Sequence, residues 1–115
     1  MNTFAESIEN FFEISLDLCF LANAEGFFLK VNSSFTRTLG WSKSELLSRC
    51  FSEFIHPDDI ENTEAAVISL KQGSQIHAFE NRFRTKQGGY RHLQWSSWLC
   101  PKDGLLYGMG RNITA

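Results

Sequence analysis

The last third of the chain alternates polar and apolar residues, and this pattern constrains the fold most. The segments 79–84 and 90–95 alternate on either side of a Gly-Gly turn, and a further strand-like run covers 105–109. Successive side chains of a strand point to opposite faces, so these runs predict a sheet with one buried face and one face near water. We expect three consecutive antiparallel strands here.

The segment before these strands predicts two more strands and several short helices. The runs 18–22 and 27–31 flank a turn at 23–26, which predicts a hairpin. Asn32 is expected to cap a helix that ends at Gly40, and Ser42 with Glu45 forms a capping box for the next helix, through residue 47. Helices grouped between two clusters of strands are typical of an α+β fold with an antiparallel sheet.

A longer helix is predicted between the short helices and the last three strands. Pro57 suits its first position, Asp58 and Asp59 suit its positive end, and Gly73 ends it. His56 is expected to act as a cap there.

Residues 4–14 have the pattern of an amphipathic helix. Phe4, Ile8, Phe11 and Phe12 fall at helical spacing, with acidic and amide residues between them. We therefore divide the chain into an N-terminal amphipathic helix, residues 1–16, and a domain, residues 17–115. The apolar stripe of the helix needs a partner, either the sheet of the same chain or a second copy.

Charge, hydropathy and cysteine content exclude several classes of protein. A net charge of -2 gives no basic face for nucleic acid. No run of about 18 apolar residues predicts a membrane span, and the N-terminus does not resemble a signal peptide. Cys19, Cys50 and Cys100 are odd in number and widely spaced. Reduced thiols of this kind indicate a cytoplasmic protein.

The sequence carries no pattern of an enzyme or a metal site. It lacks Gly-x-Ser-x-Gly, a P-loop and His-Glu-x-x-His. Asp58 and Asp59 are neighbours, and neighbouring helical side chains point about 100° apart. His56, His77 and His92 are isolated, which is typical of surface or hydrogen-bonded histidines. We expect no catalysis by this domain and no metal.

Several motifs in a fixed order resemble a PAS domain with its C-terminal PAC part. They are Asn23-Ala24-Glu25-Gly26, Val31-Asn32, Leu39-Gly40-Trp41-Ser42, His56-Pro57-Asp58-Asp59, Lys86-Gln87-Gly88-Gly89 and Arg111-Asn112-Ile113-Thr114. The resemblance runs from about Ser7 to Thr114. Gln87 and Asn112 stand where the family usually has Asp.

The resemblance implies a five-stranded antiparallel sheet with short helices on one face that enclose a pocket. Such domains sense a ligand, cofactor or partner, or dimerise, and pass the signal to a C-terminal output domain. In bacterial proteins that look like this, the output is commonly a histidine kinase or a GGDEF diguanylate cyclase. The expected function is thus an N-terminal sensory and dimerisation domain in two-component or cyclic-di-GMP signalling. A flavin or haem sensor of light, redox state or gas is the alternative.

The residues do not favour either cofactor. Flavin-binding members that form a bond to flavin follow the pattern Gly-Arg-Asn-Cys-Arg-Phe-Leu-Gln, and Cys50 falls one residue early in the matching segment 48–53. A shift of one residue turns a helical side chain by about 100°. Haem members place a His on the long helix, whereas none occurs in 58–72. We expect Cys50 to be a buried or half-buried apolar residue, and we predict no cofactor, while a small ligand stays open.

The inward face of the predicted sheet gives the candidates for such a ligand. Asn81 is expected to lie inward beside Phe79 and Phe83, where an unpaired amide would cost about 1–3 kcal/mol. Gly108 and Gly110 are expected to face inward and leave space, unless aromatic rings fill it. We favour a small or collapsed pocket. The pocket candidates are Phe20, Ala22, Asn81, Phe83, Trp95 and Gly110.

The outward face of the same strands gives a candidate interface. Trp98, Tyr107 and Met109 are expected to form an exposed apolar patch, which usually marks an interaction surface. The helical stripe of Phe4, Ile8, Phe11 and Phe12 is expected to cover this patch, within one chain or across a homodimer.

Overall fold

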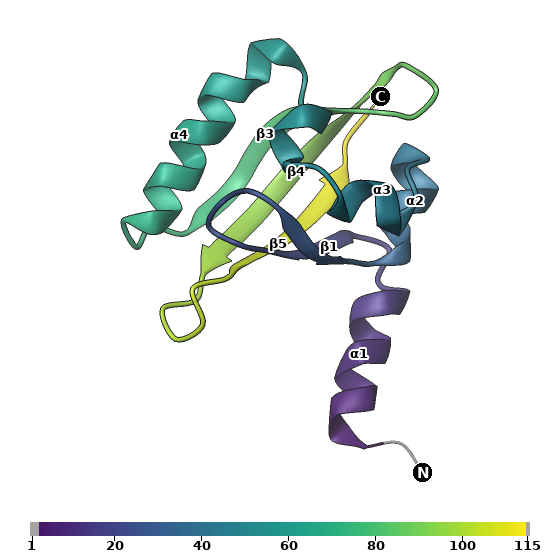
Figure 1. Cartoon of the computed structure of the whole chain (residues 1–115), viewed down its shortest axis with the longest axis vertical. Coiled ribbons are helices and arrows are strands. Elements are labelled where there is room, and N and C mark those ends of the chain that lie inside the picture. Colours follow the sequence, from purple (N-terminus) through teal and green to yellow (C-terminus); the bar gives the residue numbers. More distant parts are fainter. Residues whose placement is uncertain (1–2, 115) are drawn as a thin grey trace.

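The computed structural model describes residues 3–114 and contains one five-stranded antiparallel sheet (Figure 1). The strands are β1 (Leu18–Ala22), β2 (Phe28–Val31), β3 (Ile76–Arg84), β4 (Tyr90–Leu99) and β5 (Leu106–Asn112), in the spatial order β2-β1-β5-β4-β3. The predicted α+β class and sheet are confirmed. The strand β4 continues four residues beyond the predicted run, because it pairs with β5 as far as Leu99 and Leu106.

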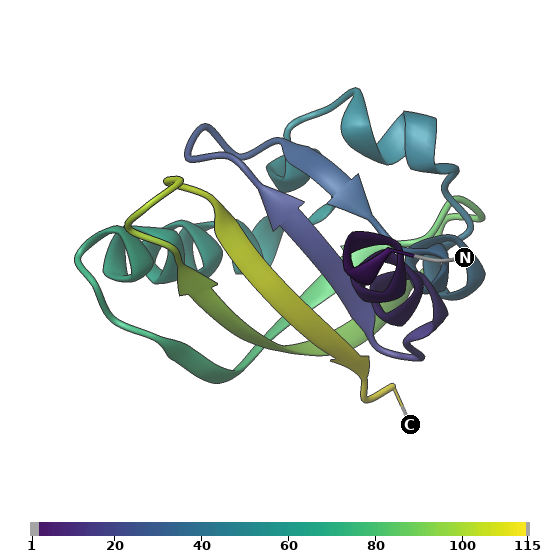
Figure 2. The ribbon, with the colours of Figure 1, turned by 90° about the horizontal axis from the view of Figure 1, so that it is seen from below.

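Short helices connect β2 to β3. They are α2 (Ser33–Leu39), α3 (Lys43–Leu47), the 3₁₀ helices η1 (Phe51–Phe54) and η2 (Pro57–Asp59), and α4 (Ile60–Lys71). Figure 2 shows α4 on the far side of the sheet and α1 (Phe4–Ile14) on the near side. The core lies between the sheet and the helices α2 to α4. Its fully buried side chains include Leu18, Phe35, Leu39, Leu46, Phe54 and Leu93.

The helix boundaries follow the predicted signals. Gly40 has a φ of 87° and ends α2, and Ser42 and Glu45 form the capping box that opens α3. Positive φ at Gly40 is a conformation that other residues rarely adopt. The ring of His56 accepts a hydrogen bond from the backbone N–H of Asp58, so its predicted capping role is confirmed.

The predicted role of Asn32 is wrong in one respect. Asn32 occupies the N-cap position of α2, but its side chain makes no capping hydrogen bond there. The side chain is fully buried and turns instead toward the end of α1 and the start of β1. Hydrogen bonds to distant parts of the chain therefore replace the local capping hydrogen bond that we predicted for this side chain.

Aromatic rings fill the space beside Gly108 and Gly110, which is the alternative that the sequence left open. A Cβ added at Gly108 would lie 2.1 Å from the ring of Phe20, and one at Gly110 would lie 2.5 Å from the ring of Trp95. The two rings occupy the space that side chains at these two positions would take, so the missing side chains make room for aromatic packing. Phe20 and Trp95 are themselves 5.5 Å apart between ring centroids.

A β-bulge interrupts β3 near its start. Ile76 pairs with Ser97 and Phe79 pairs with Trp95, so two residues of β3 lie opposite one residue of β4. Ala78 in the bulge has a φ of 59°, unusual for a residue with a Cβ. Because of the extra residue, both Ile76 and Phe79 face the helical side, where they line a cavity.

Candidate functional site: an interior cavity, an outer face and the base of the N-terminal helix

A cavity of about 60 Å³ lies between α4 and the inner face of the sheet. Its lining is almost entirely apolar, and no charged side chain of the described residues contributes to it. The lining comprises Phe20, Phe28, Phe51, Ile55, Thr63, Ala66, Val67, Leu70, Ile76, Phe79, Asn81, Phe83, Trp95, Ser97 and Leu106. The small volume agrees with the predicted small or collapsed pocket.

One chain of hydrogen bonds crosses the wall of this cavity. The indole Nε1 of Trp95 donates to Oδ1 of Asn81 at 2.8 Å, and Nδ2 of Asn81 donates to Oγ1 of Thr63 at 3.2 Å. The Thr63 hydroxyl in turn donates to the carbonyl oxygen of Asp59 at 2.7 Å. Asn81 is 5% exposed, so the partner that its inward position requires is supplied by β4 and α4.

The hydrogen-bond chain ends at an ion pair on the surface. The carboxylate of Asp59 accepts from Nε and Nη2 of Arg82, both at 2.9 Å, and from the Arg82 backbone N–H. These bonds hold the pKa of Asp59 below its ordinary value and raise the pKa of Arg82. Asp59 lies at the helix N-terminus as predicted, in η2 and at the N-cap position of α4, but its side chain makes no capping hydrogen bond and pairs with Arg82 of β3.

Four of the six predicted pocket residues line the cavity, namely Phe20, Asn81, Phe83 and Trp95. Ala22 is fully buried in β1 but does not line it, and Gly110 lies beneath the Trp95 ring. The sequence interpretation missed Thr63. Thr63 precedes Ala66, Val67 and Leu70 at helical spacing, and that pattern could have identified it.

The outer face of the sheet carries the predicted apolar patch. Trp98 is 41% exposed, Tyr107 38% and Met109 56%. The rings of Trp98 and Tyr107 lie 5.8 Å apart, and the Tyr107 hydroxyl donates to the Asp103 carboxylate at 2.6 Å. This bond raises the pKa of Tyr107 to about 12.

A groove of about 690 Å³ joins this patch to α1. Ile8, Phe11 and Phe12 line one side of the groove, and Trp98, Tyr107 and Met109 line the other. The structure thus brings together six of the seven predicted interface residues. Phe4 does not line the groove and is 83% exposed.

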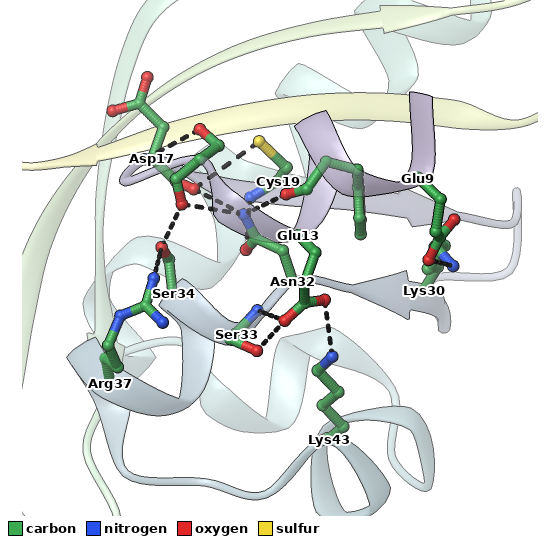
Figure 3. Close-up of polar contacts among 12 residues, drawn as sticks. Glu9, Glu13, Asp17, Cys19, Lys30, Asn32, Ser33, Ser34, Arg37 and Lys43 are labelled. Carbon is green, nitrogen blue, oxygen red and sulfur yellow. Dashed lines mark hydrogen bonds and ion pairs between the residues drawn. The ribbon is translucent and has the colours of Figure 1, made fainter. Parts of the chain in front are cut away.

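Polar contacts fix the base of α1 to the domain (Figure 3). Nδ2 of Asn32 donates to the carbonyl oxygens of Phe12 and Asp17, each at 2.9 Å, while Oδ1 accepts from the backbone N–H of Cys19 at 3.0 Å. One side chain therefore joins the end of α1, the connection that follows it and β1. We call these contacts the Asn32 clamp.

Ionic contacts surround the Asn32 clamp. Glu13 accepts hydrogen bonds from Ser33 and pairs with Lys43 at 2.9 Å, and Glu9 pairs with Lys30 (Figure 3). The charged groups of both pairs are substantially exposed, so water and salt weaken them. The buried amide contributes more to the orientation of α1 than the ion pairs do.

The cysteines are free in the part of the chain that the structure describes. Cys50 is half-buried, as predicted, and its sulfur accepts a hydrogen bond from Ser52 at 3.3 Å. Burial raises the pKa of the Cys19 thiol. Within residues 3–114, no three His, Cys, Asp or Glu side chains are placed to hold a metal, and no helix has the length and apolar content to cross a membrane.

The sheet order and the cavity beneath α4 agree with a match to a known family. The family model for the PAS fold matches residues 28–108. The chain belongs to the PAS fold family. Members of this family are sensory domains of signalling proteins, so the coarse prediction of a PAS sensory domain is confirmed.

Solved PAS structures share this fold across nearly their whole length. A domain of a sensor histidine kinase/response regulator from Geobacter sulfurreducens is 24% identical, with a TM-score of 0.83, and the match covers 94% of this chain and 93% of that one. A PAS domain from Colwellia psychrerythraea is 19% identical, with a TM-score of 0.84 and coverage of 97% and 98%.

A third PAS structure contains a ligand. The PAS domain of the quorum-sensing receptor RpfR from Cronobacter turicensis, in complex with C12:0, is 17% identical with a TM-score of 0.74, and the match covers 87% and 96% of the two chains. No curated protein matches this chain.

Proposed function

We propose that this PAS domain is a cytoplasmic sensory and dimerisation module that regulates a C-terminal output domain, a histidine kinase or a GGDEF diguanylate cyclase. The observation that carries the dimerisation part is the uncovered apolar groove between α1 and the outer sheet face. The sensor histidine kinase context of the Geobacter sulfurreducens domain supports the kinase as output.

A second copy of the chain is the partner that suits the groove. Phe11 is 71% exposed and Met109 56%, so α1 leaves both its own stripe and the sheet patch in contact with water. Large exposed apolar patches usually mark interaction sites. Each copy carries both surfaces. In a two-fold dimer, the groove of each copy can therefore be buried against the other copy.

The end of β5 supports transmission toward the C-terminus. Ile113 donates its backbone N–H to the carbonyl oxygen of His92 at 2.8 Å, and the Thr114 hydroxyl accepts from the His92 N–H at 2.8 Å. The chain therefore leaves the sheet bound to β4, the strand that carries Trp95 at the cavity and Trp98 at the outer face. A change at either face of the sheet that displaces β4 is therefore transmitted to residues 113–114, where the chain leaves the sheet.

The dimer proposal is tested by Phe11→Glu and Trp98→Glu, measured by analytical ultracentrifugation. Each change places a carboxylate in the groove, and we expect the dissociation constant of the dimer to rise about tenfold or more. Ile68→Glu is the matched control, because Ile68 on α4 is 56% exposed and lies outside the groove. Equal self-association of all three variants and the native chain would count against the interface.

Sensing of a small ligand is the second candidate, and the interior cavity favours it. The ligand in the RpfR PAS domain is compatible with this candidate. A flavin or haem does not fit, because the cavity of about 60 Å³ is smaller than the ~150 Å³ that accommodates benzene in a protein core. An absorption spectrum of purified protein tests this point, since a flavin band near about 450 nm or a haem Soret band would contradict it.

A further inference from the structure

We infer that the interior cavity binds a small uncharged molecule with an apolar body and one hydroxyl or carbonyl oxygen, and that Asn81 recognises this oxygen. The inference rests on the ligand-sensing candidate. Phe20, Ile76 and Ser97 line both the cavity and the groove, so the inference is tested apart from the dimer interface with variants of residues that line only one of the two.

Asn81 is a buried polar group of the cavity with hydrogen-bonding capacity to spare. An amide NH₂ carries two hydrogens, and one of them goes to Thr63. Its carbonyl oxygen has two lone pairs, and one takes the indole hydrogen of Trp95. Within residues 3–114 the second amide hydrogen has no hydrogen-bond partner, although Asn81 is only 5% exposed. A ligand oxygen would satisfy it.

Thr63 does not compete for this role. Its single hydroxyl hydrogen goes to the carbonyl oxygen of Asp59, and its oxygen already accepts from Asn81. Ser97 is the remaining polar side chain of the lining, but it is half-buried and also lines the outer groove. We therefore assign the recognition of one oxygen to the buried amide of Asn81.

The lining excludes a charged ligand. Its polar members Thr63, Asn81 and Ser97 are all neutral, and the rest of the described lining is apolar. Transfer of a carboxylate or ammonium group from water into such surroundings without a counter-charge is strongly unfavourable. The cavity therefore selects an alcohol or ketone over an acid or amine of the same size.

The volume limits the ligand to a few heavy atoms. A cavity needs about 10–15 Å³ to hold one water molecule, and about 150 Å³ accommodates the six heavy atoms of benzene, so ~60 Å³ suits an aliphatic molecule of about two or three heavy atoms, such as ethanol. A ligand bound at Asn81 can affect how α4 packs on the sheet. The hydrogen bond between Asn81 and Thr63 joins α4 to the sheet, and the ligand oxygen would contact the same amide.

The test is a titration of the ¹⁵N-labelled 115-residue chain with ethanol, followed by NMR. We expect saturable shifts of the Asn81 side-chain amide and the Trp95 indole signals. Sodium acetate at matched concentration should give no saturable shift of these signals. Comparable affinity for acetate, or the absence of saturation with ethanol, would overturn the inference.

Asn81→Leu keeps the size of the side chain and removes its hydrogen bonds. We expect the affinity for ethanol to fall about tenfold, the typical effect of losing one hydrogen bond. Asn62→Leu is the matched control, because Asn62 is exposed on α4 and does not line the cavity, and it should retain the native affinity. If Asn81→Leu does not fold, Thr63→Val takes its place: this variant frees an amide hydrogen of Asn81, so binding must persist, and loss of binding would overturn the assignment.

The dimer variants separate this inference from the proposed dimerisation. Phe11→Glu should retain the native affinity for ethanol, because Phe11 does not line the cavity. Failure of the dimer proposal thus leaves the titration unchanged, and failure of the titration leaves the ultracentrifugation result unchanged.

Discussion

At the scale of single residues, buried amides join parts of the chain that are distant in sequence. Asn32 ties the end of α1 to β1, and Asn81 ties β3 to β4 and α4. In both cases the side chain has a hydrogen-bond partner that no local pattern could reveal. The sequence indicated that Asn81 is inward and needs a partner, but the identity of that partner depends on how α4 lies over the sheet.

Asn32→Leu is expected to lower the free energy of unfolding by about 2–4 kcal/mol, because it leaves the Cys19 N–H and the carbonyls of Phe12 and Asp17 without this partner. Urea denaturation measures the change. Asn112→Ala is the control, because Asn112 is exposed at the end of β5. If Asn32→Leu lowered the free energy of unfolding only as much as Asn112→Ala does, then water or other groups would replace the contacts of the Asn32 clamp.

Ala78→Gly is expected to stabilise the protein by about 0.5–1 kcal/mol, since Ala78 has a φ of 59° and glycine adopts positive φ without steric cost. The matched control is Ala65→Gly on the exposed side of α4, which should destabilise by about 1 kcal/mol. Thermal unfolding measures both effects. We expect the Tm to rise for Ala78→Gly and to fall for Ala65→Gly. Destabilisation by both would mean that the bulge does not strain Ala78.

At the scale of elements, the sequence predicted the strands and helix ends well because their signals are local. The capping box of α3, the glycine after α2 and the alternation in β3 and β4 each depend on residues a few positions apart. The pairing of Asp59 with Arg82 is different, because it depends on η2 lying beside β3. The cavity depends in the same way on α4, whose Thr63 contacts β3.

The ion pair between the start of α4 and β3 predicts how stability depends on pH. Arg82 lowers the pKa of Asp59 in the folded protein, so the contribution of this carboxylate is present above its unfolded pKa of about 4 and is lost as the pH falls further. Asp59→Asn should therefore destabilise at neutral pH and should flatten the loss of stability below about pH 4. Urea midpoints from pH 2 to pH 7, roughly the range of this titration, measure both effects.

Asp58→Asn is the control for that series. Asp58 is exposed and does not bond to Arg82, so its replacement should leave most of the acid dependence in place. Parallel pH profiles for the native chain and Asp59→Asn would contradict the assignment of the ion pair.

At the scale of the whole molecule, one sheet separates two surfaces with different proposed partners. The inner face lines a cavity with the neutral amide of Asn81, and the outer face carries an apolar groove. The sequence predicted this division because alternation assigns every second side chain to one face. The sequence also favoured a small pocket, but it could not predict that the rings of Phe20 and Trp95 occupy the space over Gly108 and Gly110.

Dimerisation predicts that thermal stability depends on protein concentration. Association of the folded state stabilises it by mass action, so the Tm of the native chain should rise as the protein concentration increases. The Tm of Phe11→Glu should depend less on concentration, since its groove is disrupted. Scanning calorimetry over a hundredfold range, about enough to change the dimer fraction, tests this. A Tm independent of concentration in the native chain would indicate a monomer.

The three tryptophans give the molecule a built-in set of fluorescent reporters. Trp95 is 5% exposed beside the cavity, Trp41 is 8% exposed and donates to the carbonyl of Arg84, and Trp98 is 41% exposed in the groove. The emission of an indole shifts to the blue when water is removed from around it. With two of the three replaced by Phe, each remaining indole would report separately on the cavity, the core or self-association, without an added dye.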